Sequence, residues 1–372
     1  MGFAGTPQWP PEFVMPRVVL DMMDRRPIWA MPQWVPEQIR AALPSDWELV
    51  VIDEKTDGSG DGARRVSEAV LKAVASAEIY FGYGIAAELI EAGEALRWVH
   101  SGAAGVGSSL TPTMLSSDVV FTNSAGIHAA PMAESVIGMA LYFGRGFDMA
   151  VINQRASEWD TAPYYRSGAP LSELSSSTLG IVGYGGIGRE VARRAASLGA
   201  RVVALKRTPP GPEDAALEAV SGGGSLAANI DVVHGAEGLS RVLTESDVLV
   251  LAAPETDLTR GMIDADALKR MKTGSLLINV SRGKLVVESD LVAALREGRL
   301  RGAGLDVLAK EPLAADHALW ALPNVLITPH VSAVTRGFWA RETSLILHDL
   351  DCFSRGAPST EWRNLVDKTS GY

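Results

Sequence analysis

The chain has 372 residues, 47% of them hydrophobic, and a length that predicts two or three domains with cores of their own. Its formal net charge of −10 argues against a nucleic acid or an anionic membrane as the main partner. Cys352 is the single cysteine, so no intramolecular disulfide can form, which suits a reducing compartment. No apolar stretch reaches the roughly 18 to 20 residues that span a bilayer, and residues 1–16 lack the pattern of a signal peptide. We therefore expect a cytoplasmic protein.

Strand-like and helix-like stretches alternate in the first part of the chain, which predicts right-handed βαβ units around a parallel sheet. The expected strands are Arg17–Leu20, Glu48–Ile52, Glu78–Gly82, Arg97–His100 and Asp118–Thr122, and the expected helices lie near Glu37–Leu43, Ala63–Ala75 and Ala86–Ala92. The Gly-rich turn 101–107 follows the fourth of these strands. Its small residues leave backbone N–H groups able to hold an anion, although a plain tight turn fits the sequence equally well.

A long apolar helix is predicted from about Pro131 to Asp148. Proline is favoured in the first turn of a helix, and a break at residues 123–126 precedes it. A helix this apolar is expected to be buried between domains or subunits. A Ser-rich linker at residues 167–177 then leads into a second, longer α/β series.

The second series opens with a strand at Thr178–Val182, followed by the pattern G-x-G-x-x-G and an amphipathic helix. In this strand–turn–helix context the pattern predicts a dinucleotide site, because glycines permit the tight turn and the close approach of a pyrophosphate to the helix N-terminus. A glycine-rich turn without a ligand is the alternative. The residues expected to bind the coenzyme here are Gly183, Gly185, Gly186, Ile187 and Gly188.

The end of the next strand, Arg201–Leu205, bears on the choice of coenzyme. An NAD site usually carries an Asp or Glu at that point, for the ribose hydroxyls. This chain instead has Lys206, Arg207 and Thr208, and no acidic residue lies between 191 and 212. The basic pair favours a 2′-phosphate and therefore NADP, with NAD still possible; two solvated loop charges are the alternative explanation.

Three later strands each end near a residue that can do chemistry. Leu276–Val280 leads to Arg282, Gly302–Val307 leads to Glu311, and Val325–Thr328 leads to His330. Ligands of open α/β sheets collect outside the carboxyl ends of the strands, so we expect these three side chains to share one crevice. Singly, each has an ordinary explanation, as a phosphate contact, a solvated loop charge or a structural histidine.

Together the three side chains suit the reduction of a 2-oxo acid by a nicotinamide coenzyme. The Arg282 guanidinium can grip a carboxylate and polarise the neighbouring carbonyl, while the imidazole of His330 can exchange a proton near neutral pH. A carboxylate at Glu311 would fix the tautomer of His330 and favour its protonated form. His100 is expected to line the cleft, and no metal site is expected. The other histidines are interpreted as structural: His128, His234, His317 and His348.

Residues 209–224 are rich in Gly, Pro, Ala and Ser and are interpreted as a mobile excursion. A strand at Asp247–Leu251 then resumes the sheet and leads into a loop near the coenzyme. We expect Ala253, Pro254 and Thr256 of that loop to contact the coenzyme, together with Val280. A final helix is predicted at Phe338–Phe353.

With these motifs in place, the chain resembles the D-isomer-specific 2-hydroxyacid dehydrogenase family, which includes glyoxylate/hydroxypyruvate reductases. The resemblance covers nearly everything from about Arg17, and its most specific stretches are Leu179–Gly188, Met271–Asp306, Glu311-Pro312-Leu313 and Thr328-Pro329-His330. It implies two doubly wound α/β domains: a flavodoxin-like substrate-binding domain (residues 1–124 and 332–372) interrupted by a Rossmann NAD(P)-binding domain (residues 125–331). It also implies a homodimer and a small 2-oxo acid as substrate.

The resemblance implies roles for particular residues. Arg282, Glu311 and His330 would be catalytic, Asp306 would contact the nicotinamide amide, and Arg207 and Thr208 match the second strand end of NADP-dependent relatives. A substrate-carboxylate loop would fall on Ala103, Ala104 and Gly105, with Tyr83 nearby. Three departures stand out: Gly107 replaces a common Asp, the connection at 209–233 is long, and the N-terminal extension has no counterpart.

Two other functions remain open at this point. A related oxidoreductase on the same scaffold, such as a formate or phosphite dehydrogenase, would oxidise a small anion. A coenzyme-sensing protein resembling the transcriptional corepressors would bind coenzyme and a protein partner with little turnover. A substrate panel distinguishes the three.

Overall fold

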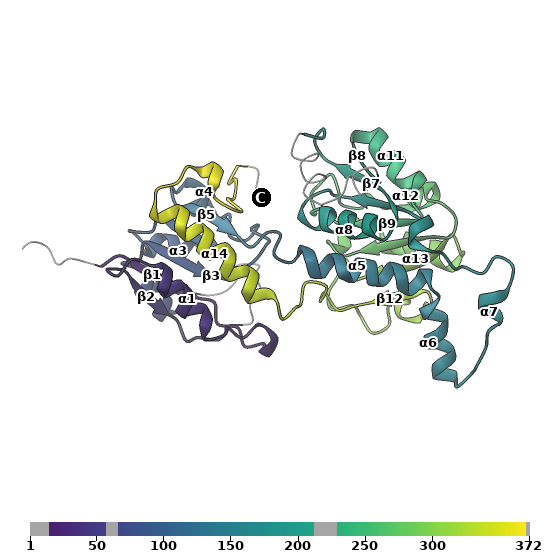
Figure 1. The fold of residues 1–372 in the computed structure, drawn as a ribbon, viewed down its shortest axis with the longest axis horizontal. Helices are drawn as coiled ribbons and strands as arrows, with labels where there is room; N and C mark the ends of the chain where they lie inside the picture. Colours follow the sequence, from purple (N-terminus) through teal and green to yellow (C-terminus); the bar gives the residue numbers. More distant parts are fainter. Residues whose placement is uncertain (1–14, 57–65, 212–228, 370–372) are drawn as a thin grey trace, which may run out of the picture. The chain divides into compact units, whose positions relative to one another are not determined.

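The computed structural model describes residues 15–56, 66–211 and 229–369, and the chain divides into two compact units (Figure 1). The first unit is Met1–Ile127 with Thr335–Tyr372, and the second is His128–Val334. The chain therefore leaves the first unit once and returns to it.

The first unit is built on a five-stranded parallel sheet. Its spatial order, β2-β1-β3-β4-β5, is the flavodoxin-like doubly wound order. The strands are β1 (Arg17–Asp21), β2 (Glu48–Val51), β3 (Ile79–Gly82), β4 (Trp98–Ser101) and β5 (Val120–Asn123). This arrangement confirms the expected fold of the first part of the chain.

Two apolar layers cover this sheet, because successive strand residues point to opposite faces. Val18 and Phe81 face the layer formed by α1 (Trp34–Ala42) and α14 (Phe338–Ser354), which carries the C-terminal part of the chain onto the first sheet. Val19 and Val99 face the other layer. That layer contains α2 (Glu68–Val74), α3 (Ala87–Ala92) and α4 (Pro112–Ser116).

The second unit is a seven-stranded parallel sheet in the order β12-β11-β10-β9-β6-β7-β8. Read from the first strand of the unit, this is the Rossmann order 3-2-1-4-5-6 with one strand added. The strands are β6 (Thr178–Val182), β7 (Arg201–Lys206), β8 (Ile230–His234), β9 (Val248–Leu251), β10 (Ser275–Asn279), β11 (Leu300–Leu305) and β12 (Val325–Ile327). The expected Rossmann domain is confirmed.

Helices cover both faces of the second sheet. α5 (Ala129–Gly144) and α8 (Gly186–Ser197) pack on one face, and α11 (Gly235–Glu245), α12 (Ala265–Arg270) and α13 (Glu288–Arg296) pack on the other. The remaining helices are α6 (Phe147–Ala156) and α7 (Ala162–Tyr165), with short 3₁₀ turns at Pro27–Trp29, Leu174–Ser176, Gly283–Leu285, Ala318–Ala321 and Ser359–Glu361. α6 and α7 extend away from the sheet of their unit (Figure 1).

One expectation about the second unit is wrong. The predicted helix from Pro131 to Asp148 ends at Gly144, because Gly146 takes a left-handed conformation (φ 71°) and starts α6 in a new direction. The apolar residues of α5 pack on α8, β10 and β11 of the same unit.

Strand β8 lies inside the predicted long connection, and only one of its five residues is buried. An edge strand this exposed has no clear apolar pattern to detect.

The N-terminal extension, the start of the helix predicted at Ala63–Ala75 and most of the predicted excursion at 209–224 lie outside the described residues. Within the part of the chain that is described, no single helix is long and apolar enough to cross a membrane. The pair α5 and α6 passes that test by length and composition only, and its two helices meet at 66°.

Candidate active site

The turn after β6 has the geometry of a dinucleotide cradle. A Cβ on Gly188 would collide with the carbonyl oxygen of Gly183, so glycine is required where α8 starts against the strand. Around Gly185, by contrast, nothing lies within 4 Å of the Cβ position. This open space lies at the N-terminus of a 12-residue helix, where backbone N–H groups and the helix dipole favour phosphate. The residues present therefore fit the pyrophosphate of a dinucleotide.

The basic residues after β7 lie beside this turn. Leu205 of β7 accepts a hydrogen bond from the Gly183 amide (3.0 Å), so the ends of β6 and β7 are neighbours. Lys206 is half-buried, and Arg207 and Thr208 are exposed. The structure thus places both cations at the strand end where the sequence predicted the ribose of the coenzyme.

Arg282 follows β10, and a buried asparagine holds its turn. Asn279, which is 1% exposed, donates from Nδ2 to the Arg282 carbonyl (2.9 Å) and accepts from the Ser281 amide and hydroxyl (3.1 Å each). The guanidinium of Arg282 is exposed, and its Nη1 donates to the Ser281 carbonyl (2.7 Å). A buried polar anchor therefore presents a cation at the carboxyl end of the sheet.

A buried carboxylate holds the turn that carries His330. Asp306 accepts from the Thr328 hydroxyl (2.6 Å) and from the amides of Val331 (2.9 Å) and Ser332 (3.0 Å). Its carbonyl accepts from the His330 amide (2.9 Å). His330 has a positive φ of 56°, a conformation that side chains other than glycine rarely adopt unless their surroundings enforce it.

His330 and Glu311 form the pair that the sequence predicted. The Nδ1 atom of His330 lies 2.8 Å from Oε2 of Glu311, and the other oxygen of Glu311 accepts from the Leu308 amide (2.9 Å). Both side chains are partly exposed, at 49% and 37%. With Nδ1 bonded to the carboxylate, Nε2 is the imidazole nitrogen that remains for a substrate.

The ends of β10, β11 and β12 are adjacent in the sheet, since Asn279 pairs with Leu305 and Leu305 with Ile327. The turns bearing Arg282, Glu311 and His330 therefore start at one edge. A backbone contact joins two of these turns, because a Cβ on Gly283 would collide with the backbone of Leu308. The loop after β9 with Ala253, Pro254 and Thr256 starts at the same edge, as do Val280 and Asp306.

In the first unit, the turn after β4 was expected to offer backbone amides to an anion, and one of these amides is not available. The Ala103 amide is already engaged, because it donates to the Ser101 hydroxyl (3.2 Å), which also accepts from the Gly84 amide (3.1 Å). Among the described residues, the amides of Ala104 and Gly105 have no hydrogen-bond partner, and both residues are exposed. Two N–H groups of this turn thus remain for an anion.

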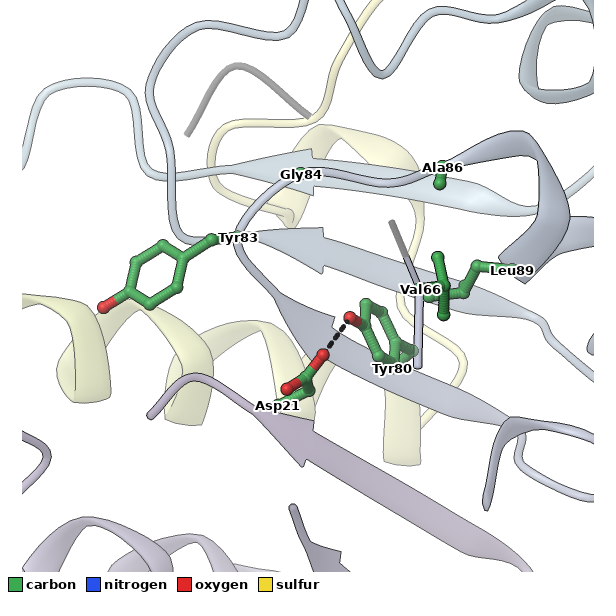
Figure 2. Close-up of a pocket in the computed structure, with 7 residues that line it drawn as sticks. All are labelled: Asp21, Val66, Tyr80, Tyr83, Gly84, Ala86 and Leu89. Carbon is green, nitrogen blue, oxygen red and sulfur yellow. Dashed lines mark hydrogen bonds between the residues drawn. The ribbon is translucent and has the colours of Figure 1, made fainter. Parts of the chain in front are cut away.

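The aromatic residues near that turn are buried. Tyr80 donates its hydroxyl to Asp21 (2.8 Å) beneath a small cavity, and Tyr83 points away from that pair (Figure 2). The Tyr83 side chain is 6% exposed and its hydroxyl has no partner among the described residues. Burial, together with the charges of Glu342 and Asp24, raises the pKa of Tyr83 well above its usual value, so the phenol stays neutral.

The expectation that His100 lines a cleft is wrong. His100 has no exposed surface, and its two ring nitrogens lie 2.8 Å from the Thr122 hydroxyl and 2.9 Å from the Glu342 carboxylate. Ser124 links the same carboxylate (2.7 Å) to the carbonyl of Ser101 (3.0 Å). This buried network supports the β4 turn from beneath, so the role of His100 is structural.

Sequence reasoning missed three anchoring residues: Asn279, Glu288 and Ser101. Glu288, on α13, accepts from the Ala309 amide (2.7 Å) and holds the loop that leads to Glu311. Each of the three is a common residue type that bonds backbone groups distant in sequence or inside a loop. The one available signal was position, because Asn279 and Ser101 are the last, polar residues of strands that contain mostly apolar or buried residues.

Comparison with known proteins decides the family. Residues 137–332, more than half of the chain, match the description "D-isomer specific 2-hydroxyacid dehydrogenase, NAD binding domain". The chain belongs to the D-isomer-specific 2-hydroxyacid dehydrogenase family. It is thus an NAD(P)-dependent oxidoreductase of 2-hydroxy acids, and the matched segment falls on the seven-stranded unit.

Members of this family with similar sequences and structures cover most of the chain. The glyoxylate/hydroxypyruvate reductase A of Escherichia fergusonii is 32% identical over 290 residues, which is 76% of this chain and 83% of that protein. A family member from Xanthobacter autotrophicus, solved with NADPH and MES, has a TM-score of 0.72 and 25% identity over 96% of this chain and 100% of its own. An NADPH-dependent glyoxylate/hydroxypyruvate reductase from Sinorhizobium meliloti, solved with NADP and sulfate, has a TM-score of 0.69 and 26% identity over 96% and 100%.

The close approach of Gly283 to the backbone of Leu308 should couple the turn of Arg282 to the loop that leads to Glu311. Gly283→Ala forces the Arg282 turn away from the loop that leads to Glu311, because the added methyl meets backbone atoms that cannot rotate aside. Overpacking of this kind costs about 1–3 kcal/mol, measurable by urea unfolding. A shift near 1 Å in a catalytic group lowers kcat/KM by about 10²-fold. The control is Gly138→Ala on α5, where the Cβ position is open; wild-type kinetics in Gly283→Ala would contradict the coupling.

Proposed function

We propose that the protein reduces small 2-oxo acids, of the glyoxylate and hydroxypyruvate kind, to D-2-hydroxy acids with NADPH. The observation that carries the proposal is the 2.8 Å contact between His330 and Glu311, next in the sheet to the turn that bears Arg282. The names of the Escherichia fergusonii and Sinorhizobium meliloti relatives support the substrate class. The direct test is NADPH oxidation with glyoxylate, hydroxypyruvate, pyruvate and phenylpyruvate. Oxidation of formate or phosphite without turnover of any 2-oxo acid would point to the other chemistry.

His330 acts as the general acid in this proposal. Glu311 holds Nδ1, so the ring presents Nε2 to the substrate carbonyl oxygen and donates the proton that the new hydroxyl requires. In the opposite direction the neutral ring takes the proton back.

Each unit offers donors that suit an anionic substrate. In the second unit, the Arg282 guanidinium holds the carboxylate and polarises the adjacent carbonyl, since its planar donors match two oxygens at once. In the first unit, the amides of Ala104 and Gly105 are donors that suit a carboxylate, while Ala103 contributes the shape of the turn. Buried Tyr83 contributes packing under that turn and a neutral phenol.

NADP is the proposed coenzyme. Bound nicotinamide supplies the hydride, and the chain holds the pyrophosphate at Gly183–Gly188, the 2′-phosphate at Lys206, Arg207 and Thr208, and the nicotinamide end near Ala253 to Thr256, Val280 and Asp306. The solved relatives from Xanthobacter autotrophicus and Sinorhizobium meliloti contain NADPH or NADP, which supports this choice.

Coenzyme preference tests the basic pair. Arg207→Ala should lower kcat/KM for NADPH by about tenfold or more and leave NADH nearly unchanged, because one or two charge-assisted hydrogen bonds contribute roughly 1.5–3 kcal/mol each. Arg270→Ala, an exposed arginine on α12, is the matched control. Equal efficiency of the wild type with both coenzymes would refute the assignment.

Substitution of Glu311 tests the pair of Glu311 and His330. The carboxylate of Glu311 holds Nδ1 of the ring, which leaves Nε2 for the substrate. Glu311→Gln keeps the shape, but its side-chain amide can donate as well as accept at Nδ1, so the tautomer and orientation of the ring are no longer fixed. The variant should lower kcat for reduction by up to about 10²- to 10⁴-fold, the contribution of general acid catalysis, with a smaller change in KM. A wild-type kcat in Glu311→Gln would show that Glu311 does not position His330.

Kinetic measurements distinguish the role of His330 as proton donor from the role of Arg282, which binds the substrate carboxylate. His330→Ala should lower kcat by about 10²- to 10⁴-fold at every pH, because the proton donor is gone. Arg282→Ala should raise KM and lower kcat together, since the guanidinium acts on both the carboxylate and the carbonyl. An Arg282→Ala enzyme with a normal KM for the 2-oxo acid would refute this role of Arg282.

We further propose a cytoplasmic homodimer. The segment of α6 and α7 carries the apolar surface that an interface requires: Phe147 (53% exposed), Ile152 (47%), Trp159 (97%) and Tyr165 (85%). Aromatic side chains this exposed on one projecting segment are typical of contact surfaces. The single, buried Cys352 is compatible with a reducing compartment.

Light scattering tests the dimer. The wild type should show the mass of two chains at micromolar concentration, and Trp159→Ser combined with Tyr165→Ser should shift it toward one chain. Leu258→Ser removes an equally exposed apolar side chain outside this segment (87%) and should not. A wild-type mass of one chain would contradict the proposal.

A further inference from the structure

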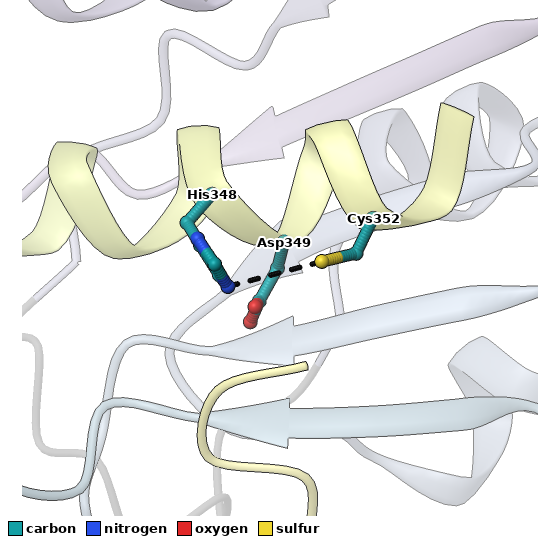
Figure 3. Close-up of side chains that lie close together, drawn as sticks. All are labelled: His348, Asp349 and Cys352. Atoms are coloured by element: carbon teal, nitrogen blue, oxygen red, sulfur yellow. Dashed lines mark hydrogen bonds between the residues drawn. The ribbon is translucent and has the colours of Figure 1, made fainter. Parts of the chain in front are cut away.

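Three side chains that can bind a metal converge on one side of α14, a helix of the first unit. His348, Asp349 and Cys352 place a ring nitrogen, a carboxylate oxygen and the sulfur within 4.8 Å of one another. Figure 3 shows all three leaving the same side of the helix, with the carboxylate between the imidazole and the thiol. Cys352 lies four residues after His348 and three after Asp349, and residues three and four apart share a face of a helix.

A fourth donor comes from the chain that follows the helix. The carbonyl oxygen of Glu361 lies 2.9 Å from Nε2 of His348 and 3.7 Å from the sulfur of Cys352, and the nitrogen and sulfur are 3.8 Å apart. Bond lengths of about 2.0–2.3 Å at tetrahedral angles separate zinc ligands by roughly 3.4–3.6 Å. The two distances to the sulfur are thus close to those of a tetrahedral site, while the nitrogen and the carbonyl oxygen, now hydrogen-bonded at 2.9 Å, move slightly apart when an ion binds.

The buried carboxylate supplies an independent indication. Asp349 has no exposed surface, and its Oδ1 accepts from the Arg363 amide (2.9 Å). Its Oδ2 is buried and has no hydrogen-bond partner among the described residues. A buried carboxylate oxygen without a partner is costly, and a bound cation is one of the few groups that satisfies it.

We propose that His348, Asp349, Cys352 and the carbonyl of Glu361 bind a divalent ion of borderline softness, for which Zn²⁺ is the best match. The mixed nitrogen, sulfur and oxygen set suits Zn²⁺ and disfavours Mg²⁺ and Ca²⁺, which prefer oxygen ligands alone. The half-buried ring of His348 gives the ion access from solvent. Binding replaces the hydrogen bond between His348 and Glu361 and releases the thiol proton of Cys352.

The neighbouring charges are compatible with this site. Arg355 places Nη2 3.6 Å from the sulfur and is itself paired with Asp351 (2.8 Å) and with the Glu361 carboxylate (2.7 Å). The ion would tie the turn at Ser359–Glu361 to α14. Its role is therefore to fasten the C-terminal segment, and it takes no part in hydride transfer.

Cobalt absorption tests the site without an activity assay. Since Cys352 is the only cysteine, a sulfur-to-cobalt charge-transfer band in the near ultraviolet can come from no other residue. Protein treated with EDTA and titrated with Co²⁺ should develop this band, with intense visible bands of tetrahedral cobalt, up to one ion per chain. Zn²⁺ should displace the cobalt, slow the reaction of Cys352 with a thiol reagent and raise the melting temperature.

Variants connect the band to its ligands. Cys352→Ser should abolish it, and His348→Gln and Asp349→Asn should each weaken Zn²⁺ binding by roughly tenfold or more. His317→Gln, a partly exposed histidine that lies near Glu288 in the other unit, is the control and should leave the band unchanged. Normal dehydrogenase turnover confirms that each variant is folded. Absence of the band in the wild type, or cobalt binding that survives Cys352→Ser, would overturn the proposal.

Discussion

The hydrogen bonds to the Asp306 carboxylate are the interaction on which the proposed catalytic geometry depends. They fix the turn in which His330 adopts its left-handed backbone conformation, and that turn aims the imidazole at Glu311. Hydrogen bonds to a charged group contribute about 1.5–3 kcal/mol each, enough to enforce a backbone strain of roughly 1–3 kcal/mol. Asp306 is 1% exposed, so water does not compete for these bonds.

The same arrangement is found at other strand ends. A buried polar residue satisfies the backbone of a turn, and the turn then presents an exposed group. Asn279 supports Arg282, and Ser101 supports the turn that leaves the Ala104 and Gly105 amides available. The parallel sheets bring these turns to one edge within each unit, since strands in register end together. The groups proposed to react thus belong to partly exposed residues, and the buried residues beneath them fix the turns that carry those groups.

The sequence predicts the two sheets and the Glu311–His330 pair because these depend on local patterns: apolar runs that alternate with helices, and polar residues at strand ends. Edge strand β8 escapes prediction because its residues are mostly half-exposed and carry no apolar period. The burial of His100 depends on Glu342, 242 residues away, so no local pattern reveals it. The actual direction of α6 is fixed by the positive φ of Gly146, which a helical pattern through Asp148 hides.

Chiral analysis of the product of hydroxypyruvate reduction tests the central claim most directly. Hydroxypyruvate and NADPH should yield D-glycerate with the wild type, and the yield should fall with His330→Ala in parallel with NADPH oxidation. L-glycerate as the product, or no reduction of any 2-oxo acid by an enzyme that binds NADPH, would contradict the account.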